Sequence, residues 1–287
     1  MKRRAFLVAA ALAALPARAE RYERGLLWRV TKAGKASHIF GTIHDADVRV
    51  VELPAPAAKA FAATHTLMVE FFPDAYSRER FTEAAMFDDR QTLEEKIGAE
   101  DFIRVLQQLA PTGLEPEVIG RLKPWGALIN LRHFAADSPE SLDGRLIGQA
   151  RARRLAVFQM EGVEEQIFAF DECPMETQVA LLKHTLAHRD QLMQLEDETI
   201  QAYLARDLSA IWRLREGFIA RYPAVAAHQA VMTKRLLYDR SVVMAYRMQR
   251  ELRRGGAFVA VGALHLYGEK GVLALLQEDG YRATRVY

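Results

Sequence analysis

Two histidines and two glutamates occupy corresponding positions in this sequence. His44 and His265 each end a G-x-x-H pattern, and Glu70 and Glu161 each follow a short apolar segment. Two imidazoles with one or two carboxylates are ligands suited to Zn, Mn, Co or Fe(II). A metal bound by such a set lowers the pKa of its water from 15.7 to about 7. The four residues therefore suggest a site that activates water for hydrolysis.

The apolar segments before these residues are predicted strands of an α/β fold. Strands are expected at 26–31, 37–43, 66–71, 155–160 and 257–261, helices at 54–63 and 271–278, and an edge strand at 282–287. The first two strands are expected to form a hairpin, and alternation of strands with helices predicts a central mixed, partly parallel sheet. Ligands of open α/β sheets bind outside the carboxyl ends of the strands, so we expect the four side chains at one rim.

Two long stretches of helix formers interrupt the strands, at about 75–153 and 165–254. We interpret them as helical insertions packed over one end of the sheet. The chain has no Gly/Ser linker, Pro-rich hinge or low-complexity tract that would mark a boundary. Residues 20–287 are therefore expected to form a single α/β domain.

The N-terminal residues have the pattern of a secretory signal peptide. Lys2, Arg3 and Arg4 precede an unbroken apolar run over 5–15, and Ala-Arg-Ala at 17–19 is a small-x-small cleavage site. The arginine pair fits a twin-arginine signal or the basic start of a Sec signal, and the sequence leaves both routes open. We expect residues 1–19 to be removed and the mature protein to be periplasmic.

Composition limits the remaining function classes. The mature chain would carry 35 basic and 37 acidic side chains, so its near-neutral charge gives no reason to expect nucleic-acid binding. No later segment reaches the eighteen or so apolar residues of a spanning helix, so no membrane span is expected after cleavage. Cys173 is the only cysteine, which excludes an intrachain disulfide.

The motifs around the two histidines resemble those of the TraB/GumN family. The second one is the more specific, because Val261-Gly-Ala-Leu-His265 continues into Leu-Tyr-Gly268. The family is related to the Tiki-type metalloproteases and, more distantly, to erythromycin-esterase-like and ChaN-like proteins. The resemblance spans nearly the whole mature chain and extends to Leu27-Trp28-Arg29-Val30, Glu70, Lys123-Pro-Trp125, Leu142-Asp143, Glu161 and Glu165-Gln166.

Two departures from the family pattern affect residues expected to contact substrate. Ser241 stands where the family usually has Asn after Arg, and Phe71-Phe72-Pro73 replaces the acidic residues that often follow the first Glu motif. Arg240, on a predicted long helix, either binds a substrate carboxylate or stabilises an oxyanion, or is a surface charge. Lys123 and Trp125 either line the cleft or form a proline kink with a packed Trp.

The mechanism expected from these residues is metal-dependent hydrolysis of a peptide or of another amide or ester. His44 and His265 would ligate the metal, one of Glu70 and Glu161 would complete the ligand set, and the other would be the general base. Arg240 or Lys123 would stabilise the oxyanion. The Tiki resemblance implies a peptidase that uses Mn or Co. The sequence decides neither the role of each Glu nor the choice among Mn, Co and Zn.

Other functions remain open. The TraB resemblance also suggests an exported protein that binds and sequesters a peptide without cutting it, and the ChaN resemblance suggests iron or haem binding. Two histidines and a carboxylate also occur in Fe(II) oxygenases. The oligomeric state is undetermined, a dimer being one possibility. The pair His184 and His188 lacks the glutamate of H-E-x-x-H, and we predict a solvated helix face there.

Overall fold

A computed structural model describes residues 22–45, 47–72, 74–88, 90–131 and 141–287. The signal peptide predicted at residues 1–19 lies outside the described residues. Within them, one mixed sheet has the strand order β4-β3-β5-β2-β1-β6. The strands are β1 (Leu27–Lys32), β2 (Lys35–Thr42), β3 (Thr66–Val69), β4 (Ala156–Gln159), β5 (Ala257–Gly262) and β6 (Arg282–Arg285).

The sheet has a parallel part and an antiparallel edge. Strands β2, β5, β3 and β4 are mutually parallel, because β5 pairs in parallel with both β2 and β3, and β3 with β4. Strand β1 forms an antiparallel hairpin with β2 and pairs with β6 on its other side. The predicted mixed, partly parallel sheet with an N-terminal hairpin is therefore confirmed, as is the predicted C-terminal edge strand.

Helices fill the two long stretches between strands and the connections at the sheet. They are α1 (Ala55–Ala62), α2 (Ala75–Ala84), α3 (Leu93–Ile97), α4 (Ala99–Leu109), η2 (Ala110–Thr112), α5 (Pro116–Arg121), α6 (Pro124–Leu131), α7 (Leu142–Ala152), α8 (Val163–Asp171), α9 (Met175–Ala187), α10 (Arg189–Leu204), α11 (Leu208–Ala220), α12 (Pro223–Thr233), η4 (Lys234–Asp239), α13 (Arg240–Arg254), η5 (Ala263–Leu266) and α14 (Val272–Glu278).

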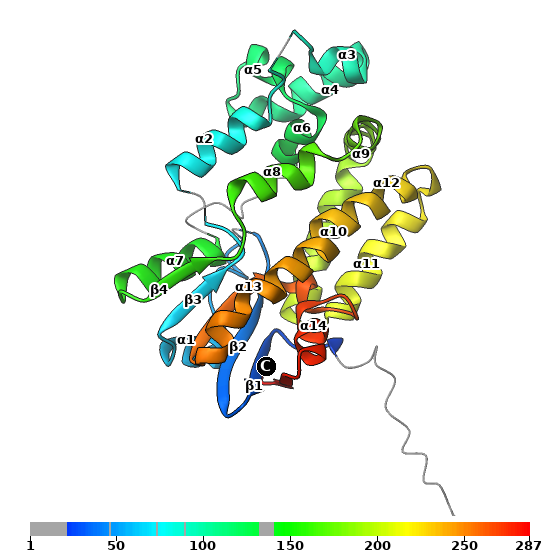
Figure 1. The fold of residues 1–287 in the computed structure, drawn as a ribbon. Coiled ribbons are helices and arrows are strands. Elements are labelled where there is room, and N and C mark those ends of the chain that lie inside the picture. The colour runs from blue at the N-terminus through cyan, green and yellow to red at the C-terminus, as the bar shows by residue number, and fades with distance from the viewer. Residues whose placement is uncertain (1–21, 46, 73, 89, 132–140) are drawn as a thin grey trace, which may run out of the picture.

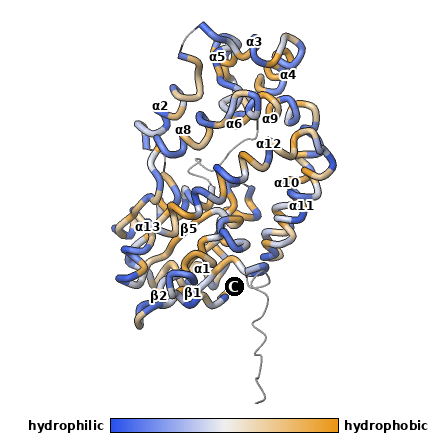
Figure 2. Tube along the Cα trace, turned by 45° about the vertical axis from the view of Figure 1, so that its right-hand side comes forward, coloured by the Kyte–Doolittle hydropathy of each residue, from blue (hydrophilic) through white to orange (hydrophobic). Residues whose placement is uncertain are grey.

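Helices cover both faces of the sheet. Right-handed crossovers between parallel strands put α1 and α7 on one face and α13 and α14 on the other, and Figure 1 shows α13 in front of the strands. Strand β5 lies between β3 and β2 and is buried along its whole length. It carries the unbroken apolar run expected of a strand covered on both faces, and Figure 2 colours it hydrophobic.

The helical stretches form a second hydrophobic core beyond one end of the sheet. Helices α2 to α6 and α8, α9 and α12 lie together above the strands in Figure 1. Their core contains Trp125, whose ring stacks on Phe170 at 5.4 Å and meets Phe81 edge-on at 5.3 Å. The sheet and its flanking helices enclose a separate core cluster. Functional side chains can therefore lie where the two cores meet.

The solvated face predicted for His184 and His188 is wrong for His184. Its side chain is buried on α9, and its ring lies 4.6 Å from that of His188 and 4.7 Å from that of Tyr222. The buried side of α9 extends further around the helix than its apolar residues predict. Phe218 of α11 and Tyr222, directly before α12, pack against the ring of His184.

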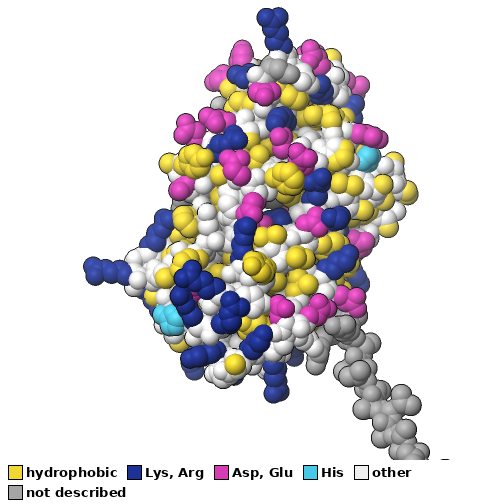
Figure 3. Space-filling view, in the orientation of Figure 1, with side chains coloured by type: hydrophobic (Ala, Val, Ile, Leu, Met, Phe, Trp, Pro, Cys, Tyr) yellow, Lys and Arg dark blue, Asp and Glu magenta, His cyan; other side chains and the backbone are white. Residues whose placement is uncertain are grey.

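The face of the molecule drawn in Figure 3 has no single dominant charge. Figure 3 shows acidic and basic side chains mixed over most of the visible face, with Lys and Arg gathered near its lower left. No helix in the described ranges combines the length and the apolar character that crossing a bilayer requires.

Candidate active site

Four of the residues singled out from the sequence lie past the carboxyl ends of the parallel strands. Glu70 directly follows β3, and Glu161 follows β4 by two positions. His44 follows β2 by two positions, and His265 lies in η5, just past the end of β5. Because β4, β3, β5 and β2 are neighbours and run in the same direction, their ends form one rim.

The carboxylate of Glu70 lies between the two imidazoles. Its Oε2 is 3.8 Å from Nε2 of His44, and its Oε1 is 3.7 Å from Nε2 of His265. These separations are too long for direct hydrogen bonds. The backbone N–H of Gly262, the last residue of β5, donates to Oε1 of Glu70 and so fixes the carboxylate at the centre of the rim. His265 and Glu70 are buried, whereas His44 is one-third exposed.

Each imidazole is held at its other nitrogen. Nδ1 of His44 lies 3.3 Å from Oδ2 of Asp143, a carboxylate that also accepts a hydrogen bond from Thr42. Nδ1 of His265 lies 2.8 Å from the hydroxyl oxygen of Ser241. Since an ionised carboxylate only accepts, His44 donates from Nδ1. The Nε2 atoms of both rings are therefore directed at Glu70, the usual arrangement of histidines that ligate metals.

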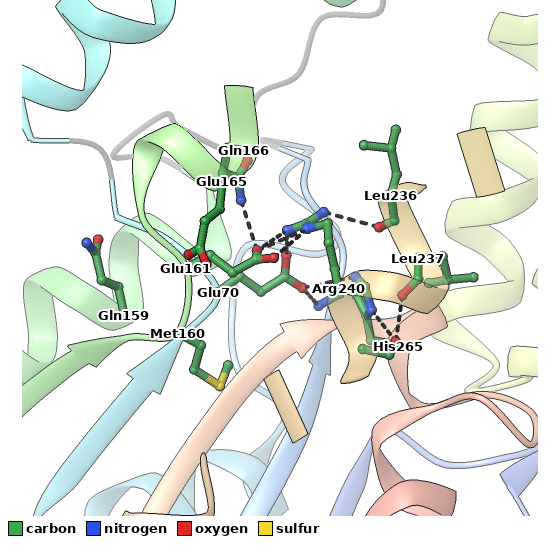
Figure 4. Close-up of polar contacts among 12 residues, drawn as sticks. Glu70, Gln159, Met160, Glu161, Glu165, Gln166, Leu236, Leu237, Arg240 and His265 are labelled. Atoms are coloured by element: carbon green, nitrogen blue, oxygen red, sulfur yellow. Dashed lines mark hydrogen bonds and ion pairs between the residues drawn. The ribbon is translucent and has the colours of Figure 1, made fainter. Parts of the chain in front are cut away.

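Glu161 belongs to the same network through Arg240 rather than through the histidines. Nε of Arg240 lies 2.9 Å from Oε1 of Glu161, and its Nη2 donates to Glu161 at 2.6 Å and to Glu70 at 2.7 Å. Gln166 also donates to Glu161. Figure 4 shows Arg240 reaching both carboxylates from the start of α13. One guanidinium thus joins the two glutamates predicted at the strand ends.

The π-helical turn η4 shapes this part of the rim. Such turns leave carbonyl groups outside the regular helical ladder and are common at functional sites. Here the carbonyl oxygen of Leu236 accepts from Arg240, and that of Leu237 accepts from Ser241. Carbonyl groups of η4 therefore hold the two side chains that the start of α13 sends into the network.

Burial and charge set the protonation of the central groups. Burial alone would lower the pKa of His44, but Asp143 and Glu70 raise it to about 9. Burial lowers the pKa of His265 to about 4, against the pull of Glu70. Burial would raise the pKa of Glu70, yet His265, Arg240 and His44 together lower it to about 2. At neutral pH the site therefore has a charged His44, a neutral His265 and an ionised Glu70.

The donor types at the rim fit a divalent metal, although the side chains form an ion-pair network as they stand. No group of three or more His, Cys, Asp and Glu side chains among the described residues is arranged to hold a metal ion. The neutral His265 presents an Nε2 lone pair to an anionic carboxylate, a contact that a cation would make favourable. A Cβ on Gly262 would lie 3.1 Å from Nε2 of His44 and 3.3 Å from Oε1 of Glu70. The missing side chain thus leaves a small space beside these donors.

A cavity of about 350 Å³ opens above the rim. Its lining includes His44, Glu70, Arg240 and His265 from the candidate site, together with apolar side chains of the helical stretches. Tyr203 of α10 also lines it and donates from its hydroxyl to the carbonyl oxygen of Gly41, which ties the first G-x-x-H motif to the insertion. Substrate-sized molecules could therefore reach the network.

Lys123 and Trp125 do not belong to this lining. Nζ of Lys123 and Nε1 of Trp125 both donate to Asp171 at the end of α8, at 2.7 and 3.0 Å. The Trp125 ring does not line the cavity itself. It packs against Phe81 and Phe170, which do line it. The Lys-Pro-Trp segment thus fastens α6 to α8.

Asp143 and Ser241 are the site residues that sequence reasoning left without a role. Asp143 was noted only within the family resemblance, and Ser241 only as a departure from the family pattern. A serine or aspartate in a helix gives no sequence signal that it faces a distant imidazole. The only signal is local, because Asp143 lies in the first turn of a helix and Ser241 directly follows Arg240.

Comparison with known proteins identifies relatives of similar length. The model of the TraB/PrgY/gumN family matches residues 26–285. The chain is similar to the uncharacterized protein YbaP of Shigella flexneri, with 25% identity over 84% of this chain and 88% of the relative. It is also similar to the uncharacterized protein YbaP of Escherichia coli K12, with 25% identity over 84% and 87% of the two chains. No solved structure matches the chain.

Proposed function

The chain belongs to the TraB/PrgY/gumN family, and we propose that it is an exported metal-dependent hydrolase that cleaves a peptide or another amide or ester. The observation that carries the proposal is the direction of two imidazoles. Nε2 of His44 and Nε2 of His265 both face the carboxylate of Glu70, and Asp143 and Ser241 hold them from behind.

Within this proposal, three side chains that form no metal-holding group as they stand would rearrange to hold the metal. His44 and His265 would bind through Nε2, and Glu70 would supply a carboxylate oxygen. Mn, Co and Zn all accept this donor set. A bound metal would supply a water that loses its proton near neutral pH. Glu70 suits the ligand role better than Glu161, because it contacts both imidazoles whereas Glu161 is held by Arg240 and Gln166.

The remaining residues of the network orient charge at the rim. Arg240 holds the Glu70 and Glu161 carboxylates in place through hydrogen bonds to both, and it opposes the rise that burial causes in the pKa of Glu161. Because Arg240 also lines the cavity, its guanidinium lies where negative charge on a substrate carbonyl oxygen could be stabilised. Glu161 acts in this scheme as a positioning residue that fixes the guanidinium.

The experiment that tests this function measures cleavage. The mature protein is incubated with a broad peptide library, with and without a chelator, and the products are identified by mass spectrometry. The proposal predicts fragments that disappear with chelator, return with added Mn, Co or Zn, and are absent with a His44→Ala/His265→Ala variant. Fragments that persist in both the chelated and the variant samples would overturn it.

The second candidate function is peptide binding without cleavage. It is favoured by the closed ion-pair network, in which Arg240 occupies one oxygen of Glu70 and both oxygens of Glu161. A binder would return the peptide intact from the same incubation, and its affinity would be unchanged by chelator. The library experiment therefore separates the two functions.

A further inference from the structure

The cavity above the rim is lined by side chains of two kinds. Its lining includes the charged network and also four apolar side chains of the helical stretches, which we call the apolar wall: Phe81 of α2, Ile129 of α6, Phe170 of α8 and Leu236 of η4. These four apolar side chains are partly buried and pack against the helical core. Each therefore keeps apolar surface in contact with the cavity rather than with protein.

The polar groups of the described lining are largely satisfied by one another. Arg240 binds the two glutamates, and Asp143 binds Thr42 and His44. The hydroxyl of Tyr203 donates to a backbone carbonyl. A charged substrate group next to the apolar wall would lose its hydration without gaining a partner, which is costly.

The size of the cavity limits what can enter. A volume of about 350 Å³ lies at the lower end of the range for pockets that bind small ligands. A pocket of this size suits a short extended segment with one or two large side chains. The ligand therefore reaches the rim as an unfolded peptide or as a molecule of similar size.

We propose that this site selects short peptides with a large apolar side chain, of the size of Leu or Phe, next to the bond that lies at the rim. This inference rests on the proposed function and names its substrate class. Contact with Phe81, Ile129 and Leu236 removes apolar surface of both peptide and protein from water, which favours binding. The same contact disfavours Glu or Lys at that position.

A matched set of blocked tripeptide amides tests the proposal. The peptides differ only in the central residue, which is Leu, Phe, Glu or Lys, and binding to the full mature chain is measured by calorimetry in chelator, so that no turnover intervenes. The Leu and Phe peptides are expected to bind at least about tenfold more tightly than the charged ones. Equal affinities, or tighter binding of a charged peptide, would overturn the proposal.

Variants of Leu236 test whether the preference for apolar peptides arises at the apolar wall. Leu236→Lys is expected to reverse it, so that the Glu peptide binds about tenfold better than the Leu peptide. If Leu236→Lys does not fold, Leu236→Ala is expected to weaken the Leu peptide by about threefold to tenfold while leaving the Glu peptide unchanged. The matched control is Ile103→Lys, at an exposed isoleucine of α4 outside the cavity, which should leave the preference as in the wild type. A preference for the Leu peptide over the Glu peptide that is as large in the folded Leu236 variant as in the wild type would contradict the proposal.

The outcomes separate this inference from the hydrolase proposal. A protein that prefers apolar peptides and returns them intact would retain the specificity and refute hydrolysis. A protein that cuts charged and apolar peptides at the same rate would retain hydrolysis and refute the specificity.

Discussion

The hydroxyl oxygen of Ser241 lies 2.8 Å from Nδ1 of His265 and donates its own hydrogen to the carbonyl of Leu237 at 2.7 Å. Since a serine has only one hydroxyl hydrogen, Ser241 must accept from His265. This contact fixes the neutral ring with its proton on Nδ1 and its lone pair on Nε2. Asp143 holds Nδ1 of His44 from behind in the corresponding place, although the ring of His44 is charged at neutral pH.

The first prediction concerns this contact. Ser241→Ala should weaken metal binding by about tenfold to a hundredfold, because the tautomer and orientation of His265 would no longer be fixed. Metal affinity is measured by competition with a fluorescent chelator. The control is Ser209→Ala, at a buried serine of α11 outside the cavity lining. Equal affinity in Ser241→Ala and wild type would contradict the assigned role.

Gly262 gives a prediction that depends on space rather than on chemistry. Its φ of −52° and ψ of 136° are open to alanine, but the added methyl would lie 3.1 Å from Nε2 of His44. Gly262→Ala should therefore fold and lose at least about tenfold in metal affinity. Gly148→Ala is the matched control, because nothing lies near its added Cβ and alanine favours the helix by up to about 1 kcal/mol. Undiminished metal binding in Gly262→Ala would show that the space is not used.

Arg240 gives a prediction on stability. Arg240→Met leaves Glu70 and Glu161 buried without their shared guanidinium, and removing one partner of such a buried network costs about 3–5 kcal/mol. The free energy of unfolding is measured in urea. Adding Glu161→Gln to Arg240→Met should restore part of the loss, since it removes one uncompensated carboxylate. A loss below about 0.5 kcal/mol would indicate that the ion pairs contribute little.

Metal affinity should increase with pH. The pKa of His44 is raised to about 9 by Asp143 and Glu70, so the metal-free protein carries a proton on that ring at neutral pH. A metal must displace this proton to bind Nε2. Affinity should therefore rise by about tenfold per pH unit up to about pH 9, with release of about one proton. Calorimetry in buffers of different ionisation enthalpy measures that release, and a pH-independent affinity would contradict the assignment of His44.

Export is tested at the N-terminus. Cleavage after Ala19 predicts that the periplasmic fraction contains a chain beginning at Glu20. N-terminal sequencing of that fraction checks the site. Replacing Arg3 and Arg4 by Lys should block a twin-arginine route and leave a Sec route intact. A full-length chain that stays in the cytoplasm would refute the signal peptide.

The strand framework could be predicted because its signals are local. The strands predicted at 66–71 and 257–261 from their apolar runs correspond to β3 and β5, with ends that differ by one or two residues. The rim followed from these strands, because parallel strands align their carboxyl ends. The strand order puts β5, which precedes His265, between β3 and β2, so the placement of Glu70 between the two imidazoles depends also on its hydrogen bond from Gly262 at the end of β5.

The residues behind the imidazoles and around the cavity could not be predicted in this way. The contact of Ser241 with His265 joins two residues 24 positions apart, and no residue pattern around Ser241 signals it. The apolar wall combines α2, α6, α8 and η4, whose facing sides are set by packing in the helical core. The sequence alone does not decide whether Lys123 lines a cleft, because it does not show that the side chain binds Asp171.

The most direct test of the account is the metal content of the purified mature protein. After loading with Mn, Co or Zn and dialysis, elemental analysis should find about one ion per chain in the wild type, and none in the His44→Ala/His265→Ala variant at the same folded concentration. Wild-type protein that retains no ion with any of the three, or a double variant that retains as much as the wild type, would contradict the claim that these imidazoles hold a metal.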